Sequence, residues 1–251
     1  MKASRAFLPF LNELIGFGML ILLWAILSLF FPVYVIPSPL EIIKSIPEYL
    51  QPKLLEALWL SLYRVFLGFG ASLFVATMLS LLLYRSKMGE WFGAMLQAFQ
   101  ILPAITVGVI LVILFGIGSP TPIGLAFLMS LPILTLNTMQ AIRSTASELS
   151  EYMDSISADT GSRFRYLLKP ALVRITKSNL LLGFGLAIKI VIMGEFIGSQ
   201  DGIGYLLNRA RLVFNMKEVF FYLLLLLLVT LAFQGLVNLL YSGPLKRYAY
   251  D

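Results

Sequence analysis

Long apolar runs separated by short polar stretches make up most of this chain of 251 residues. Several runs reach the roughly 20 residues that a helix needs to cross the hydrocarbon core of a bilayer. The pattern predicts an all-α polytopic membrane protein, with one transmembrane domain over residues 1–251 and about six spans. The expected spans are Leu14–Phe31, Leu60–Tyr84, Trp91–Phe115, Thr121–Ala141, Leu172–Ile197 and Val219–Tyr241.

A polar stretch at about residues 142–170 separates the fourth and fifth predicted spans. It is far longer than the roughly 2–8 residues that connect neighbouring antiparallel helices. Apolar residues recur at helical spacing in an acidic first part and a basic second part, with small residues between them. The pattern predicts two short amphipathic helices that a soluble partner could bind in a groove; a solvated loop without a partner fits equally well. The apolar residues are Leu149, Met153 and Ile156, then Phe164, Leu167 and Leu168.

The composition supports a membrane protein and argues against an ordinary enzyme. Hydrophobic residues make up 59% of the chain and charged residues 13%, against about 25% charged in soluble domains. The chain has no cysteine and no histidine, so it lacks thiolate ligands, disulfides and the commonest general base. The net charge of +6 would suggest nucleic acid in a soluble protein, but in a membrane protein Lys and Arg first report topology.

Counting Lys and Arg on alternate sides of the six spans predicts the orientation. One side receives twelve and the other five, so the positive-inside rule places the first side, with both termini and residues 142–170, in the cytoplasm. The twelve are Lys2, Arg5, Arg85, Lys87, Arg143, Arg163, Arg165, Lys169, Arg174, Lys177, Lys246 and Arg247, and the five are Lys44, Lys53, Arg209, Arg211 and Lys217.

Two segments on the predicted outer side carry turn-forming residues. Prolines at positions 37, 39, 47 and 52 prevent one continuous helix after the first span, although Pro39 could begin a short helix along the interface. Gly198, Gly202 and Gly204 precede a short amphipathic piece after the fifth span. Both segments shape the outer mouth in one interpretation and only connect spans in the other.

Several stretches resemble, in the same order, the permease subunits of ATP-binding-cassette importers, within them the nitrate, sulfonate and taurine group. They cover most of the chain beyond the first span. The resemblance implies the type I importer permease architecture and a bacterial inner-membrane location. The stretches are IPSP from Ile36, SLYRVFLGF from Ser61, FGIG from Phe115, LPILTLNTMQAIRS from Leu131 and GEFIGSQDGIGYLL from Gly194.

Half of the family's cytoplasmic signature is retained within residues 142–170. Where the signature has two alanines, this chain has Tyr152 and Met153, and where it has glycine, it has Ser157. The resemblance implies that this loop docks on an ATPase, with Pro170 ending the second short helix. The implied coupling residues are Glu151, Asp154, Ser157, Ala158, Phe164 and Pro170.

The resemblance also implies the partners. The chain has no GxxxxGK[ST] phosphate loop, so it binds no cofactor itself, and ATP is bound and hydrolysed by a pair of ATPase subunits. A second permease subunit, as a homodimer, completes the path, and an extracytoplasmic solute-binding protein delivers cargo. Membrane lipid, not nucleic acid, surrounds the chain. The implied cargo is a small anion such as a sulfonate, taurine or nitrate, or a vitamin precursor.

Ionisable residues inside spans are candidates for the transport path, because they are expensive in lipid. These are Lys189, Glu195 and Arg64. For Glu195 and Arg64 we favour a structural pairing near the outer surface, while cargo contact and snorkelling both remain open for Lys189. Hydrogen bonds between helices are favoured for the polar side chains of Gln97, Gln100, Asn137, Thr138 and Gln140.

Three other functions fit a polytopic protein. A secondary transporter often contains an inverted repeat, and the two halves of this chain show no self-similarity. The coupling subunit of an energy-coupling-factor importer would carry paired Ala-Arg-Gly motifs, which do not occur here. A membrane scaffold without transport would not need Lys189 within a span.

Overall fold

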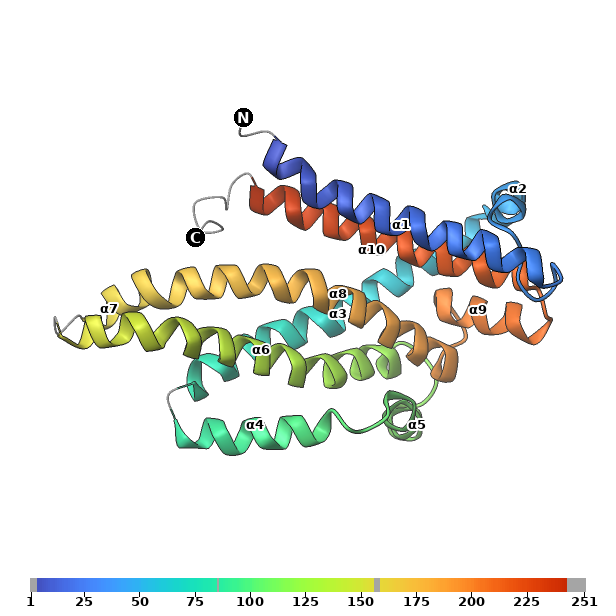
Figure 1. The fold of residues 1–251 in the computed structure, drawn as a ribbon. Helices are drawn as coiled ribbons and strands as arrows, with labels where there is room; N and C mark the ends of the chain where they lie inside the picture. Colours follow the sequence, from blue (N-terminus) through green and yellow to red (C-terminus); the bar gives the residue numbers. More distant parts are fainter. Residues whose placement is uncertain (1–3, 85, 156–158, 243–251) are drawn as a thin grey trace. The chain divides into compact units, whose positions relative to one another are not determined.

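The computed structural model describes the backbone of residues 4–84, 86–155 and 159–242, and every regular element in these ranges is a helix (Figure 1). The elements are α1 (Ser4–Phe30), α2 (Pro39–Tyr49), α3 (Pro52–Leu83), α4 (Lys87–Phe99), α5 (Ala104–Phe115), α6 (Pro120–Ser155), α7 (Thr160–Arg163), the π-helical η1 (Phe164–Leu168), α8 (Lys169–Gly198), α9 (Gly202–Leu212) and α10 (Met216–Ser242).

Four stretches among the described residues are single helices long and apolar enough to cross a membrane: Pro52–Leu83, Pro120–Ser144, Gly161–Gly198 and Met216–Ser242. They confirm the second, fourth, fifth and sixth predicted spans. A fifth candidate is a helix pair with a sharp bend, α4 and α5. The apolar helix at Ile15–Phe30 is shorter, so the total of six stays a prediction.

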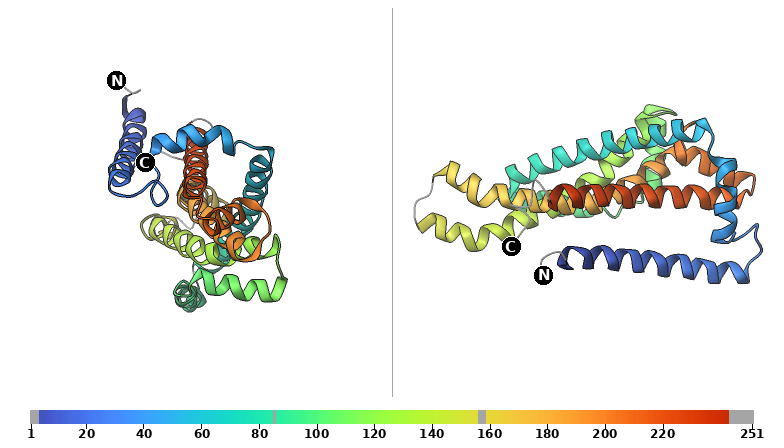
Figure 2. Two further views of the ribbon diagram at one scale, coloured as in Figure 1. Left: turned by 90° about the vertical axis from the view of Figure 1, so that its right-hand side faces the viewer. Right: turned by 90° about the horizontal axis from the view of Figure 1, so that it is seen from above.

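The third predicted span, Trp91–Phe115, is a bent pair of helices and not one continuous helix, because the axes of α4 and α5 differ by 91°. The left view of Figure 2 shows α4 end-on and α5 lengthwise, and Figure 1 shows the reverse. Pro103 is the cause: it has no N–H to continue the helix, and its ring disfavours the helical conformation of Leu102. The membrane segment is therefore interrupted at residues 100–103.

The chain divides into two units, which we describe separately. The first contains Met1–Leu55 and Leu207–Leu225. In it, the Trp24 ring stacks on Phe220 with centroids 5.3 Å apart. Helix α2 begins at Pro39 as predicted, because Ser38 and Glu41 form a capping box: the Glu41 amide donates to the Ser38 hydroxyl and the Ser38 amide to the Glu41 carboxylate.

The second unit contains Glu56–Leu206 and Leu226–Asp251, and α3, α6 and α8 form its core. Small residues let α3 approach α6 closely, at four-residue spacing: Gly68, Ser72, Ala76 and Ser80 are all buried. A Cβ at Gly68 would lie 2.7 Å from the carbonyl oxygen of Ile123, and the Ser80 hydroxyl donates to the Thr135 carbonyl at 3.0 Å. In a membrane the hydrophobic effect does not drive helices together, so their association depends on close van der Waals packing. A stripe of small residues permits that packing.

The predicted pair of short cytoplasmic helices is corrected by the structure. Helix α6 continues without interruption from Pro120 to Ser155, so the acidic part extends the fourth span. The predicted turn between the two helices is Ser157–Gly161, of which residues 157 and 158 lie outside the described residues. Asp159, within this turn, caps α7 by accepting hydrogen bonds from the amides of Gly161 and Ser162 at 3.0 and 3.3 Å.

Pro170 does not end a helix, contrary to the prediction, because α7, η1 and α8 follow one another directly and Gly161–Gly198 is one long helical stretch. Pro170 cannot donate the usual hydrogen bond four residues back. The turn before it is π-helical, and the Lys169 amide donates to the Phe164 carbonyl five residues back. A widened turn next to a proline lets the helix continue.

Candidate functional site

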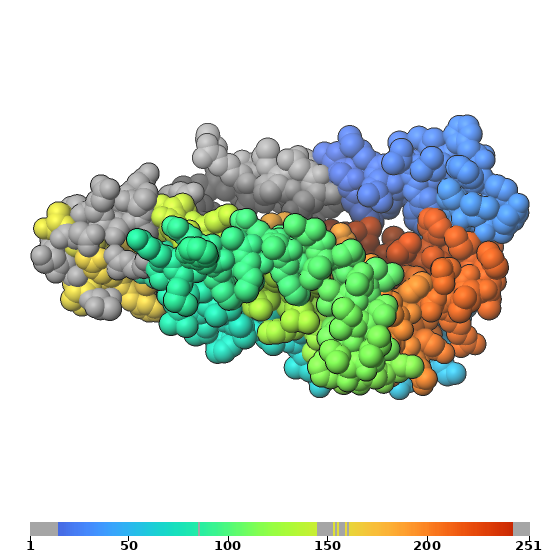
Figure 3. All heavy atoms as spheres, turned by 90° about the horizontal axis from the view of Figure 1, so that it is seen from below, coloured from blue at the N-terminus to red at the C-terminus, as the bar shows by residue number. Residues whose placement is uncertain are grey.

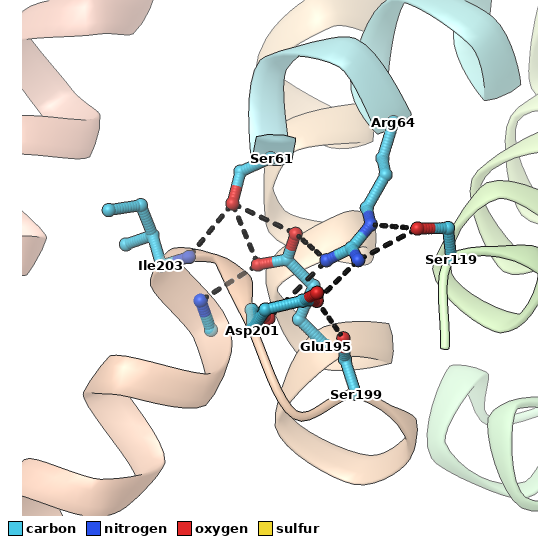
Figure 4. Close-up of polar contacts among 8 residues, drawn as sticks. Ser61, Arg64, Ser119, Glu195, Ser199, Asp201 and Ile203 are labelled. Carbon is cyan, nitrogen blue, oxygen red and sulfur yellow. Dashed lines mark hydrogen bonds and ion pairs between the residues drawn. The ribbon is translucent and has the colours of Figure 1, made fainter. Parts of the chain in front are cut away.

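A buried ion pair joins α3 and α8 in the second unit (Figure 4). An Arg64 Nη1–H donates to Glu195 Oε1 at 2.8 Å, and both side chains have no exposed surface in the chain. The two residues that we expected to have a structural role are thus each other's partner. Removing two charges from water is costly, and such a pair persists only where further hydrogen bonds satisfy both groups.

The donors of Arg64 all find acceptors in the cluster. Nε–H donates to the Ser119 hydroxyl, Nη1 to Glu195 and to the Asp201 carbonyl at 3.3 Å, and Nη2 to Ser119 and to the Asp201 carboxylate. A guanidinium has five N–H groups, and these five contacts use them all. Arg64 therefore connects α3 with two loops, the one before α6 and the one after α8.

Glu195 is satisfied just as fully. Its carboxylate accepts from the Ser61 hydroxyl at 2.8 Å to each oxygen, and from the Gly204 amide at 2.8 Å. The Ser61 hydroxyl oxygen in turn accepts from the Ile203 amide at 2.8 Å. The first amides of α9 are thus held by α3 and α8, which fixes where α9 begins.

Glycine is required where the loop between α8 and α9 passes the carboxylate. Gly202 has a positive φ of 87°, and a Cβ there would lie 2.4 Å from the Glu195 carboxyl. A Cβ at Gly204 would lie 2.3 Å from the Ile192 carbonyl oxygen. Any larger residue would push α9 away from the ion pair.

Asp201 is the water-facing end of the cluster, with 57% of its side chain exposed. Burial raises the pKa of its carboxyl, but hydrogen bonds from Arg64 and Ser199 and the charge of Arg64 outweigh burial and lower the pKa below its ordinary value. We call Ser61, Arg64, Ser119, Glu195 and Asp201 the outer cluster. It carries one positive and two negative charges and is a structural junction, without an exposed surface at Arg64 or Glu195.

Lys189 lies elsewhere on α8 and points away from the core. It shares an exposed stripe with Leu182 and Met193, because steps of seven and four residues return to the same helix face. On the other faces, α8 is packed in the core. Among residues whose side chains the structure describes, Lys189 has no hydrogen bond or ion pair, so the structure separates it from the outer cluster.

The predicted coupling residues are only partly within the described structure. Ser157 and Ala158 lie outside the described residues, and for Glu151 and Asp154 only the backbone, at the end of α6, is described. Phe164 begins η1 with half of its side chain exposed, and Pro170 is half-buried at the start of α8. Within the side chains described, no group of three or more acidic residues could hold a metal ion.

Comparison with known proteins identifies the family. The family described as "binding-protein-dependent transport system inner membrane component" matches residues 68–243, well over half of the chain. The chain belongs to this family. It is accordingly a multi-pass inner-membrane permease subunit of an ATP-binding-cassette importer, as the resemblance implied.

Individual relatives of this permease subunit are named for different cargoes. The riboflavin transport system permease protein RibX of Chloroflexus aurantiacus is 34% identical over 146 residues, which are 58% of this chain and about half, 54%, of RibX. The formylaminopyrimidine transport permease protein ThiX of Halalkalibacterium halodurans is 25% identical and covers 84% of this chain and 85% of ThiX. The putative aliphatic sulfonates transport permease protein SsuC of Bacillus subtilis is 27% identical over 224 residues, which are 86% of this chain and 80% of SsuC.

The fold of the permease also has a solved counterpart. A chain of the MetNI methionine ABC transporter, in inward-facing conformations, superposes with a TM-score of 0.69 and 16% sequence identity, over 78% of this chain and 98% of that chain. The likeness confirms the predicted all-α type I importer permease fold.

Three members of the outer cluster were not selected from the sequence. Ser61 and Asp201 lie within stretches that carry the family resemblance, and Ser119 directly follows another. A buried Arg64 with five donors needs more acceptors than one carboxylate supplies, and that count was the available signal. Asp201 was missed because it lies beyond the end of the predicted span.

Proposed function

We propose that this permease subunit, paired with a second copy, forms the path for a small anionic solute and is driven by a separate pair of ATPase subunits. The coarse function follows from the family; the cargo and the partners are the proposal. The named relatives point to different cargoes, a sulfonate, riboflavin and a formylaminopyrimidine. Family likeness alone therefore does not choose between an anion and a vitamin precursor.

Lys189 is the observation that favours an anion. It lies nine residues before the end of α8 at Gly198, a depth of about 13 Å at 1.5 Å per residue. Lipid contact at that depth is costly for a lysine, about 2.5–3.5 kcal/mol at the centre of a membrane helix. An exposed cation on a helix packed in the core is better placed on a path between two permease subunits, where it would attract a sulfonate, nitrate or carboxylate.

Uptake by Lys189 variants tests the cargo proposal. Lys189→Met removes the charge at similar length and is expected to abolish most uptake of anions, while Lys189→Arg, the matched control, retains it. Both variants should reach the membrane in wild-type amounts and leave basal ATP hydrolysis unchanged. Wild-type uptake by Lys189→Met, or a native cargo that proves neutral or cationic, would contradict the proposal.

The proposal also includes how ATP hydrolysis by the partner subunits is coupled to movement of the spans. The end of α6 and the start of α7 present residues 142–170 to an ATPase groove, with Glu151, Asp154, Ser157, Ala158 and Phe164 at or near the contact. Closure of the ATPase pair on ATP would move this segment and switch the spans between inward-open and outward-open states. An extracytoplasmic solute-binding protein would deliver the cargo to the outer side.

The proposed orientation has both termini in the cytoplasm and α2 outside. Thiol labelling tests it, because the chain has no cysteine of its own. Glu48 on α2 and Lys87 on α4 are both exposed, so a cysteine at either position is accessible to a reagent on its own side of the membrane. Glu48→Cys should react with an impermeant reagent added to intact cells and Lys87→Cys only after lysis; the opposite pattern would overturn the orientation.

A further inference from the structure

The break between α4 and α5 places irregular backbone inside the membrane. A Cβ at Gly89 would lie 3.1 Å from the Arg143 side chain, and one at Gly93 would lie 3.7 Å from Leu136. Helix α4 therefore runs antiparallel to α6: as α4 proceeds from Gly89 to Gly93, its neighbour on α6 changes from Arg143 to Leu136. Later residues of α4 thus lie nearer to Pro120, the proposed outer end of α6.

The depth of the break follows from these contacts. Leu136 is sixteen residues beyond Pro120, which is about 24 Å along α6, and Gln100 is seven residues beyond Gly93, about 10 Å nearer the outer end. The break therefore lies about 14 Å below the outer end of α6, within a hydrocarbon core about 30 Å thick.

Several backbone groups at this depth have no hydrogen-bond partner among the described residues. The Gln100, Ile101 and Leu102 amides donate to α4 carbonyls, and those of Thr106 and Val107 donate to Pro103. No side chain caps the start of α5. Within the described residues, no hydrogen bond is formed by the carbonyls of Gln100, Ile101 and Leu102 or by the amides of Ala104 and Ile105.

The same segment is exposed. Ile101 is 81% exposed, Gln97, Gln100 and Thr106 are also exposed, and Figure 3 shows the side chains of α4 and α5 as a continuous surface. Unsatisfied backbone groups cost several kcal/mol each in hydrocarbon, so irregular backbone at membrane depth occurs only against protein or water. Lipid is therefore excluded as the neighbour of the break.

Water fits the break better than a protein surface does. A covering protein would have to supply donors for three carbonyls, acceptors for two amides and partners for the polar side chains of Gln97, Gln100 and Thr106, all in fixed geometry. Water meets these groups without such constraints. We propose that the break at residues 100–103 lines the water-filled cargo path of the transporter, with the Gln97 and Gln100 amides facing it; this inference rests on the proposed transport function.

A pair of cysteine variants tests the inference in the assembled transporter. Ile101→Cys lies at the break, and Ile113→Cys is the matched control, an isoleucine of similar exposure (77%) where α5 is regular. Only a thiolate reacts with charged methanethiosulfonates, and a thiol in lipid stays protonated, so Ile101→Cys should react roughly tenfold faster or more. The labelled fraction is measured by mass spectrometry, and attachment of a bulky reagent at Ile101→Cys should abolish most uptake.

The outcomes separate this inference from the proposed function. An unreactive Ile101→Cys in a transporter with normal uptake, or equal reaction rates at both positions, would overturn the water-lined break. Disulfide formation between two Ile101→Cys copies without reagent labelling would show that protein covers it and would also overturn it. If no anion is taken up by wild type but Ile101→Cys still labels selectively, the cargo proposal fails and the water access stands.

Discussion

The ion pair of the outer cluster predicts a strong, non-additive effect on stability. Arg64→Met leaves the fully buried Glu195 carboxylate with hydrogen bonds from Ser61 and Gly204 but without a counter-charge. Glu195→Leu leaves Arg64 with Ser119 and the partly exposed Asp201. The double variant removes both buried charges at once. Comparing the four proteins in a double-mutant cycle isolates the pair itself.

The magnitude follows from the burial of both groups. Removing one partner of a buried ion pair costs about 3–5 kcal/mol, because the other charge is left uncompensated. For a chain of this size, 1 kcal/mol shifts the unfolding midpoint by roughly 2–4 °C, so each single variant should unfold on the order of 10 °C lower. The double variant should be destabilised by less than the sum of the singles, with an interaction energy of about 2 kcal/mol.

Thermal unfolding in one detergent and at one protein concentration provides the assay. Lys87→Met is the control, since this exposed residue lies outside the cluster, and its midpoint should not move. Effects of Arg64→Met and Glu195→Leu that add to within about 0.5 kcal/mol would refute the coupling that the geometry requires.

Three further predictions concern the loop after α8 and the proposed ATPase-docking segment at residues 142–170. Gly202→Ala should lower the unfolding midpoint because of its positive φ and the nearby Glu195 carboxyl, whereas Gly70→Ala, whose Cβ meets nothing within 4 Å, should leave it unchanged or raise it. Because the folded pKa of Asp201 is lowered, its stabilisation is present above the ordinary Asp pKa and lost as the pH falls through the folded pKa; the difference in midpoint between wild type and Asp201→Asn should be constant from about pH 8 to 5 and shrink below that. Glu151→Lys should reduce co-purification of the ATPase or uncouple uptake from hydrolysis while the midpoint stays at the wild-type value, and normal stoichiometry with normal uptake would contradict the docking assignment.

The apolar runs were sufficient to predict most spans, because about 20 apolar residues have few alternatives to a membrane helix. The start of α2 was also predictable, since Ser38, Pro39 and Glu41 are a local capping signal. The break before α5 was not. Pro132 lies inside α6 without ending it, so a proline in an apolar run does not by itself predict an interruption.

Long-range geometry accounts for the parts of the site that the sequence did not reveal. Arg64 and Glu195 were selected because charges inside spans are rare. Three of their hydrogen-bond partners lie outside the predicted spans, where the apolar pattern does not position them: Ser119, Asp201 and Gly204. The segment at residues 142–170 was predicted as two separate helices because charged residues interrupt its apolar residues. A helix that leaves the membrane can continue in water. The change from apolar to polar residues near Ser144 therefore does not mark the end of α6, which continues to Ser155.

ATP-driven uptake into proteoliposomes tests the central claim most directly. The vesicles contain the permease subunit, its ATPase partner and the binding protein, with labelled sulfonate, taurine and nitrate offered in turn. We predict that at least one anion accumulates only when ATP is supplied on the side of the membrane that carries the ATPase. Omitting the permease subunit, or replacing it with Lys189→Met, should remove this accumulation. Accumulation without ATP, or equal accumulation when the permease subunit is omitted, would contradict the assignment as the pathway subunit of an importer.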